Sequence, residues 1–151
     1  MKIEDCLQQG LLVKIKSDAK KAKMSVEMAE HKLQIAEKEF DYKIFENAII
    51  SAYTSMFHSA RALLFKDGFK ERSHFAVFVY IKEKYSEKIE KKYLTELNSL
   101  RLHRHDLMYG LEKPSEIQET EADSTIKVAE EFLKAVKIII QENKPESSKK
   151  K

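Results

Sequence analysis

Apolar residues recur at helical spacing between residues 45 and 64, and they cover more than half of the circumference of the helix that this spacing generates. A helix with so much apolar surface is buried among other helices. The remaining positions follow each other at steps of four and three residues and form one narrow line, here called the polar strip: Asn47, Ser51, Thr54, His58 and Arg61. Because buried polar groups need partners, we expect the polar strip to face a second polar segment across a groove or a dimer interface.

The segments that flank this central helix also show helical periodicity. A helix is predicted from Ile3 to Ile15, with Gly10 as its weak point. The next helix is capped by Ser17 and Asp18, and it buries a stripe of mostly small residues: Ala22, Val26, Ala29, Leu33, Ala36 and Phe40. The central helix is expected to start at Asp41 and to end before Gly68, which suits the left-handed position past a last helical turn.

The second half of the chain predicts three more helices. Ser73 is a candidate N-cap for a helix from His74 to Tyr85. The β-prone residues in this segment make a strand the competing assignment, and we prefer the helix because no partner strand is evident. The following helix ends at Gly110, and its apolar face holds Tyr93, Leu94, Leu97, Leu100 and Met108. Ser115 is expected to cap the last helix, whose apolar positions are Ile117, Thr125, Val128, Phe132, Ala135 and Ile139.

Composition supports an all-α fold. The 151 residues include only three Gly and two Pro, so few turns are available and the elements are long. We therefore expect an antiparallel up-and-down bundle of about five helices. Residues 1–143 are predicted to form a single domain, and the charged segment 144–151 is predicted to be a disordered tail. A single Cys, the lack of a signal peptide and the lack of a long apolar run indicate a soluble cytoplasmic protein.

Positive charge is concentrated in the middle of the chain. Residues 47–113 contain twelve bases and eight acids, a net of +4, and four of the five histidines. Within this part, residues 100–110 form a basic segment that includes Arg101, Arg104, His105, Asp106 and Tyr109. On a helix, Arg101, Arg104 and His105 share one face. Two guanidinium groups and an imidazole are able to hold a phosphate and to move a proton, although a solvated polar helix face has the same composition.

Other chemistries find no support in the sequence. Cys6 has no second Cys for a zinc site, and His103 and His105 are two residues apart, which places them on different sides of a helix. No glycine-rich phosphate loop is present. We expect no metal and no cofactor.

The central helix and the basic segment carry a resemblance to a known family. The residues Ala52-Tyr53, Met56-Phe57-His58, Ala60-Arg61-Ala62-Leu63-Leu64, Gly68 and Ser73-His74 resemble the HEPN domain, the higher eukaryotes and prokaryotes nucleotide-binding domain. Ribonuclease members of this family carry an Arg, four to six residues, and then a His. Here only three residues separate Arg101 from His105, and Arg104 to Tyr109 is similar to the R-x-x-A-D-Y variant of the motif.

The resemblance implies a helical bundle, a homodimer, and a pairing with a minimal nucleotidyltransferase in a toxin–antitoxin-like system. The first hypothesis is a nucleotide- or RNA-associated binding module, whose ligand would contact His58, Arg61, Arg104 and Asp106. The alternative is a metal-independent endoribonuclease that uses Arg101, Arg104, His105 and Tyr109 at a dimer interface. A helical interaction scaffold without activity is a further alternative. The altered motif favours the binding module.

Overall fold

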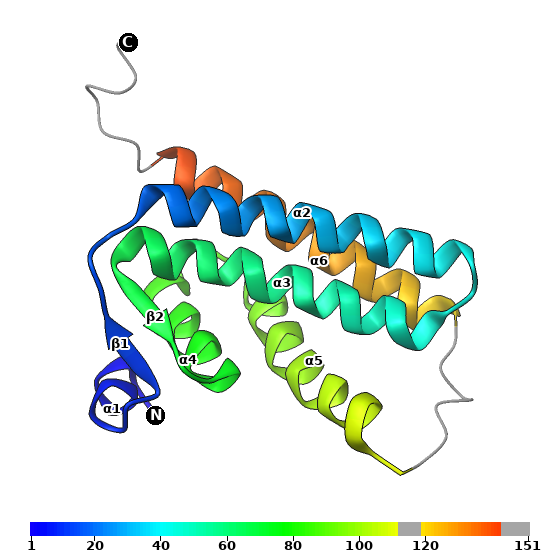
Figure 1. Ribbon diagram of the computed structural model, residues 1–151, viewed down its shortest axis with the longest axis horizontal. Coiled ribbons are helices and arrows are strands. Elements are labelled where there is room, and N and C mark those ends of the chain that lie inside the picture. The colour runs from blue at the N-terminus through cyan, green and yellow to red at the C-terminus, as the bar shows by residue number, and fades with distance from the viewer. Residues whose placement is uncertain (112–118, 143–151) are drawn as a thin grey trace.

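The computed structural model describes residues 1–111 and 119–142, and it confirms an all-α helical bundle (Figure 1). Three long helices, α2, α3 and α6, run alongside one another, and α4 and α5 lie on the opposite side of α3. A short helix and a two-stranded ribbon cover one end of the bundle. The elements in chain order are α1 (Ile3–Gln8), β1 (Leu12–Lys14), α2 (Ala19–Asp41), α3 (Phe45–Asp67), β2 (Phe69–Glu71), α4 (His74–Tyr85), α5 (Lys91–Tyr109) and α6 (Glu119–Glu142).

Helix α3 is the centre of the bundle, as its apolar periodicity predicted. It contacts α2, α4, α5 and α6, and twelve of its residues are buried. Ala22, Ala29 and Ala36 form the buried stripe of α2, and small side chains at these positions let the two backbones approach closely. The closeness is visible at Ser55 of α3, whose hydroxyl donates a hydrogen bond of 2.7 Å to the carbonyl of Ala29.

The two ends of α3 differ in how well the sequence predicted them. Gly68 ends the helix in the left-handed conformation, with φ of 88°, as expected. The predicted start at Asp41 is wrong, because Asp41 is the last residue of α2 and α3 begins at Phe45. Between them Lys43 adopts a φ of 64°, which reverses the chain in a tight turn. Phe40 and Phe45 pack on each other across this turn at 5.5 Å between ring centroids.

The predicted helix from Ile3 to Ile15 is also wrong beyond its first turns. It ends at Gln8, Gly10 has a φ of 73°, and residues 12–14 form β1. This strand pairs antiparallel with β2, with Leu12 opposite Glu71. The long-range pairing satisfies backbone groups that a helix would have satisfied locally, and it buries Leu12. Although a partner strand therefore exists, residues 74–85 are helical, with the Ser73 hydroxyl capping the amide of Ala76.

Helix α5 leaves the bundle toward its C-terminus (Figure 1). Tyr93, Leu94, Leu97 and Leu100 are buried as predicted, but Met108 is 46% exposed, so its assignment to the apolar face is wrong. Gly110 ends α5 in an extended conformation with φ of −70°.

Helix α6 buries Thr125, Phe132 and Ile139, and it leaves Val128 and Ala135 half-buried. Ser115, Ile117 and the tail 144–151 lie outside the described residues. In the part of the chain that the structure describes, no helix is long and apolar enough to cross a membrane.

Candidate functional site

His74 lies at the centre of an aromatic cluster that α3 and α4 form together. It is the first residue of α4, directly after the Ser73 cap, and this position turns its ring toward α3. The Tyr53 hydroxyl lies 2.7 Å from His74 Nδ1. The Phe57 ring stacks on the imidazole with 4.1 Å between centroids. Tyr53 and Phe57 are one helical turn apart on α3, so both reach the same side of that helix.

Two arginines of α5 complete this cluster. The Arg104 guanidinium lies 5.8 Å from the centre of the Tyr53 ring, and the Arg101 guanidinium lies 5.2 Å from the centre of the Phe75 ring. Arg101 also donates a hydrogen bond of 3.0 Å to Asn98. Within the described residues, no carboxylate forms an ion pair with either arginine, and both are half-buried. Their positive charge is therefore available to an anionic ligand.

The arginines and the burial together set the protonation of the cluster. Burial lowers the pKa of His74, and the positive charges of Arg104, Arg101 and Arg61 lower it further. Burial raises the pKa of Tyr53 to about 12, against the opposing effect of Arg104 and Arg101. At neutral pH the pair is a neutral imidazole and a neutral phenol. If Tyr53 donates to Nδ1, the His74 proton is on Nε2, where it can donate a hydrogen bond to a phosphate oxygen; in the other tautomer Nδ1 donates to Tyr53 and Nε2 is a free acceptor.

Two residues of the polar strip, Arg61 and His58, lie next to this cluster along α3. Arg61 forms an ion pair with Glu71 of β2, and its guanidinium lies 5.6 Å from the Phe57 ring centre. Burial lowers the pKa of His58 to about 4, with further lowering by Arg61, Lys32 and His74. His58 Nδ1 is buried and has no hydrogen-bond partner among the described residues. Burial thus keeps this imidazole neutral, beside the charged Arg61.

The rest of the polar strip does not meet the basic segment directly. The Ser51 hydroxyl donates to Glu39 of α2 at 2.6 Å, and the Thr54 hydroxyl donates to the Ile50 carbonyl of its own helix. Asn47 is exposed. The direct contact between α3 and Arg104 of α5 comes from Tyr53, which the apolar pattern had assigned to the core. The strip thus runs beside the candidate site.

The other predicted site residues lie on the exposed part of α5. His105, Asp106 and Tyr109 are all exposed, and the rings of His105 and Tyr109 are 5.1 Å apart. The Asp106 carbonyl accepts the Gly110 amide at 2.7 Å, which closes the helix end. The structure therefore joins Arg101 and Arg104 to Tyr53, Phe57 and His74, and it leaves His105, Asp106 and Tyr109 open to solvent.

Tyr53, Phe57 and His74 were not among the predicted site residues. Tyr53 and Phe57 follow the apolar spacing of α3, and His74 follows a cap signal, so each had a structural explanation. The available signal was that all three fall in the segments that resemble the HEPN domain.

A metal centre finds no support in the described part of the chain. No group of three or more His, Cys, Asp or Glu side chains converges there. Cys6 is buried and free.

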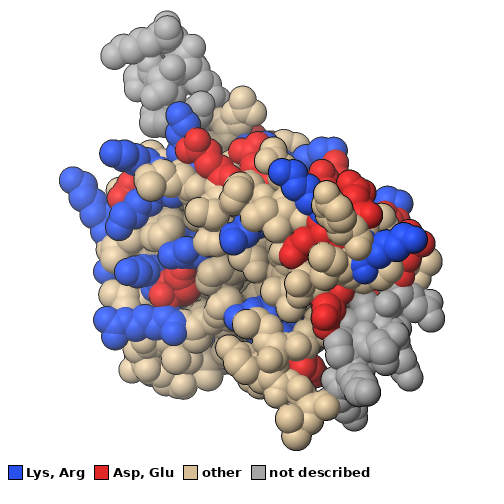
Figure 2. Space-filling view, turned by 45° about the vertical axis from the view of Figure 1, so that its right-hand side comes forward, with Lys and Arg blue, Asp and Glu red and all other residues tan. Residues whose placement is uncertain are grey.

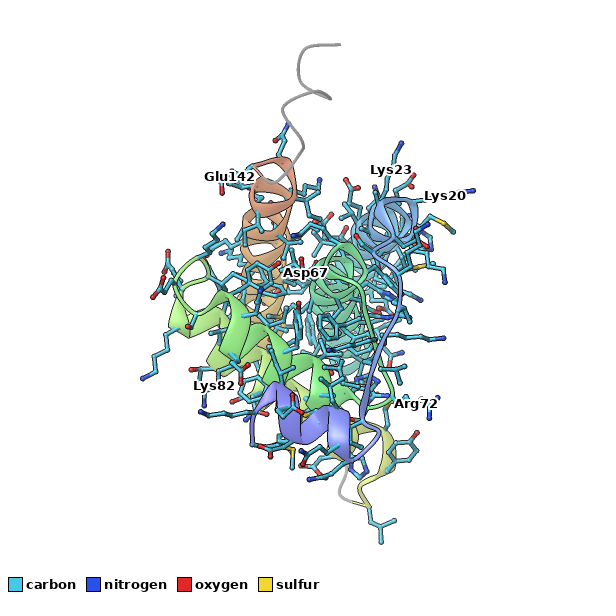
Figure 3. The ribbon with its side chains drawn as sticks, turned by 90° about the vertical axis from the view of Figure 1, so that its left-hand side faces the viewer. Lys20, Lys23, Asp67, Arg72, Lys82 and Glu142 are labelled. Atoms are coloured by element: carbon cyan, nitrogen blue, oxygen red, sulfur yellow. The ribbon has the colours of Figure 1, made fainter. Side chains whose placement is uncertain are left out.

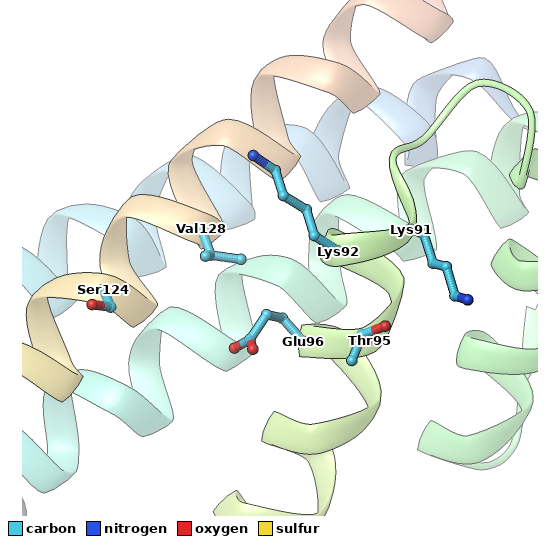
Figure 4. A pocket seen from close by; sticks show the side chains of 6 residues that line it. All are labelled: Lys91, Lys92, Thr95, Glu96, Ser124 and Val128. Carbon is cyan, nitrogen blue, oxygen red and sulfur yellow. The ribbon is translucent and has the colours of Figure 1, made fainter.

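An open groove of about 500 Å³ lies between α5 and α6 (Figure 4). Its walls consist of Lys91, Lys92, Thr95, Glu96, Ser124 and Val128. The charges are balanced here, because Lys92 lies within ion-pair distance of both Glu90 and Glu131. The groove thus offers less net charge to an anion than the arginine cluster does.

Two comparisons with known proteins cover this region. Residues 22–139 match the family model described as the HEPN domain. The chain is also 32% identical over 122 residues to a protein of Methanocaldococcus jannaschii named "Putative toxin MJ0605", an alignment that covers 78% of this chain and 87% of that protein. The matched range contains α3, α4 and α5, and therefore every residue of the arginine–histidine–tyrosine cluster.

Proposed function

The chain belongs to the HEPN domain family, and on this basis we propose that it binds a phosphate-bearing ligand, a nucleotide or RNA, at the cluster of Arg101, Arg104, Tyr53 and His74. The observation that supports this most is the pair of arginines on α5 that no carboxylate neutralises within the described residues. An arginine fork holds two phosphate oxygens at once. The rings of Tyr53 and Phe75 keep both guanidinium groups in place through cation–π contacts.

The protein acts in a toxin-like role as the partner of a minimal nucleotidyltransferase. The name of the archaeal relative supports the toxin-like role, and the nucleotidyltransferase partner rests on the resemblance to the HEPN family. The same proposal includes a homodimer. Leu102, Met108 and Tyr109 expose 53%, 46% and 63% of their surface on α5, next to the arginines, which is surface that a second subunit can cover. A dimer of this kind places two copies of the arginine pair near one interface.

A specific observation also favours the second candidate, a metal-independent endoribonuclease. Such an enzyme needs a base for the 2′-hydroxyl, a cation for the phosphate and an acid for the leaving oxygen. His74 and Tyr53 are hydrogen-bonded to each other beside Arg104. The lowered pKa keeps the His74 imidazole neutral at neutral pH. In the tautomer whose Nδ1–H donates to the Tyr53 hydroxyl, Nε2 is free and is suited to act as the base.

The binding proposal is tested by titrating labelled mononucleotides and short RNA against the wild type and Arg104 variants. Arg104→Ala removes a charge-assisted contact and is expected to weaken binding by one to two logarithmic units, about 1.5–3 kcal/mol. Arg104→Lys recovers part of this loss, because Lys lacks the planar fork. Lys134→Ala is the control, since Lys134 lies on α6 and its one ion pair among the described residues is with Glu130. Equal affinity of wild type and Arg104→Ala would refute the proposed site.

Incubation with RNA in the presence of a chelator separates the two candidate functions. An endoribonuclease cleaves under these conditions, and His74→Ala abolishes the cleavage. The sequence-based alternative assigns the same role to His105, so His105→Ala is run in parallel. Cleavage that survives both substitutions contradicts a histidine base at either position. A protein that binds RNA without cleaving it is a binding module.

A further inference from the structure

The first turns of α2 carry lysines where a helix favours acids. Lys20, Lys21 and Lys23 follow the Asp18 cap, and the first turn contains no acidic residue. The N-terminus of a helix carries a partial positive charge, so lysines there weaken the helix slightly. Sequences break a local stability rule of this kind mostly where function requires it.

Further cations lie near this end of the bundle, in the connector before α2 and on the ribbon. Lys14, Lys16, Lys70 and Arg72 are all exposed. Within the described residues, none of these four and none of the three lysines of α2 is in an ion pair. The acids beside them have other partners. Asp18 accepts the Lys21 amide at 2.9 Å, and Asp67 accepts the hydroxyls of Tyr80 and Tyr85.

The side chains between these lysines and the arginines of α5 form a continuous series of cations and rings. Lys21 lies 5.8 Å from the Phe65 ring centre, and Arg61 lies 5.1 Å from the same ring. Arg61 also lies beside Phe57, which stacks on His74. His74 bonds to Tyr53, and Tyr53 lies under Arg104. We call this series, from Lys21 to Arg104, the cationic track.

The figures show how Lys and Arg side chains are distributed over the surface. In Figure 2, Lys and Arg side chains gather on the left, which is the side where α2 begins, and acidic side chains are more frequent on the right. In Figure 3, Lys20, Lys23 and Arg72 project along one edge of the molecule, and Lys82 lies on the opposite side.

We propose that the cationic track binds a single-stranded nucleic acid, whose backbone runs from the arginine cluster to a second phosphate-binding region at Lys20, Lys21, Lys23, Lys70 and Arg72. The proposal rests on the proposed function and names the ligand class for that site as a polynucleotide strand. Tyr53 and Phe65 are twelve residues apart on α3, so the track is at least about 18 Å long. A mononucleotide cannot span this length, whereas a strand of several nucleotides does. Proteins that bind single strands hold the backbone with a series of cations, and here the rings of the track keep such cations in place.

The test compares a dinucleotide with a single strand of about twelve nucleotides, within the range of single-strand site sizes, by fluorescence anisotropy at several salt concentrations. RNA and DNA strands of the same sequence are measured separately. Equal affinities identify the shared phosphate backbone as the ligand, and tighter binding of RNA adds a contact to the 2′-hydroxyl. Either result supports the track, provided that the long strand binds at least about tenfold tighter than the dinucleotide, as counterion release predicts. Equal affinity for long and short strands overturns the proposal.

The variant is the triple substitution Lys20→Ala, Lys21→Ala and Lys23→Ala. It is expected to weaken binding of the long strand about tenfold or more and to leave dinucleotide binding unchanged. The slope of log affinity against log salt should become less negative by about 2, at roughly 0.7 for each lost phosphate contact. The matched control replaces three exposed lysines, Lys82 and Lys84 in the last turn of α4 and Lys88 in the turn that follows it, and should leave both affinities unchanged. An equal loss in both triple variants overturns the proposal, because it indicates net charge alone.

Two further readouts keep the outcomes distinct. The unfolding midpoint of the α2 variant should be no lower than that of the wild type, because Ala is a better helix former and the opposed charges are gone. Loss of long-strand binding without loss of stability is then a binding effect.

If Arg104→Ala weakens binding of the dinucleotide while the α2 variant binds the long strand normally, the proposed function stands and the track is refuted. If the α2 variant weakens long-strand binding while Arg104→Ala leaves dinucleotide binding unchanged, the arginine site is refuted. If neither the dinucleotide nor the long strand binds the wild type, both the proposed function and the track are refuted. If the α2 variant binds the long strand normally but no longer binds an acidic protein partner, the lysines serve that partner and the track is refuted.

Discussion

Asp67, at the last turn of α3, is the acceptor that ties this helix to α4. Its carboxylate accepts the Tyr80 hydroxyl at 2.7 Å and the Tyr85 hydroxyl at 2.5 Å. Lys66 forms a third contact, at 2.7 Å. The two tyrosines are 1% and 5% exposed, so water does not easily replace the carboxylate. We predict that Asp67→Ala is among the most destabilising single substitutions outside the apolar core.

The expected magnitude follows from the two buried hydroxyls. A hydrogen bond to a charged group contributes about 1.5–3 kcal/mol, and a buried donor that loses its acceptor also bears the cost of desolvation. Two such bonds suggest a loss of about 3–5 kcal/mol, when some relaxation around Ala is allowed. This is a large part of the stability of a typical domain, about 5–15 kcal/mol.

Urea denaturation of a mutant cycle measures this loss. Tyr80→Phe and Tyr85→Phe remove the donors, and adding both to Asp67→Ala should restore part of the stability, because no unpaired hydroxyl is left. Lys66→Ala is the control and should cost under about 1 kcal/mol, as expected for a partly exposed ion pair. A cost below about 1 kcal/mol for Asp67→Ala, or strictly additive losses in the cycle, would show that the carboxylate does not hold the tyrosines.

The same network has a consequence at alkaline pH. Burial, followed by the hydrogen bond to Asp67, raises the pKa of both Tyr80 and Tyr85 above the ordinary value of 10.0. The folded state thus keeps protons that the unfolded state releases. The stabilisation is complete below pH of about 10, and stability falls as the pH rises above that value. In Tyr80→Phe/Tyr85→Phe this decline between about pH 10 and 12 should be shallower.

Three further predictions follow from single positions. Gly68→Ala should destabilise the fold by about 1–3 kcal/mol, because its φ is 88° and an added Cβ would lie 2.9 Å from a backbone oxygen; Gly10→Ala, with φ of 73° but open space, should cost less in urea melts. The pKa of His58 is lowered to about 4, so stability should fall as the pH drops from about 6.5 toward 4, and NMR titration should show a neutral His58 imidazole at pH 5.5. Ala29→Leu should cost about 1–3 kcal/mol or more by overpacking α2 against α3, whereas Met28→Leu, at a position 42% exposed, should be nearly neutral.

Local signals in the sequence determined most of the helices. The cap at Ser73 and the stop at Gly68 were predicted at the observed residues, because both depend on the chemistry of one or two neighbouring residues. The burial of α3 followed from its apolar periodicity alone. These features need no information about distant parts of the chain, so a single sequence is enough to predict them.

Tertiary contacts decided the rest. Strand β1 is three residues long and exists only because β2, more than fifty residues later, supplies its hydrogen bonds, so no local pattern reveals it. Met108 follows the helical spacing of α5, but the helix has left the bundle there and the side chain finds no core. The candidate site combines Tyr53 of α3, His74 of α4 and Arg104 of α5. Each has an ordinary local role in its own helix, and only the packing of the three helices places an uncompensated guanidinium beside a hydrogen-bonded histidine and tyrosine.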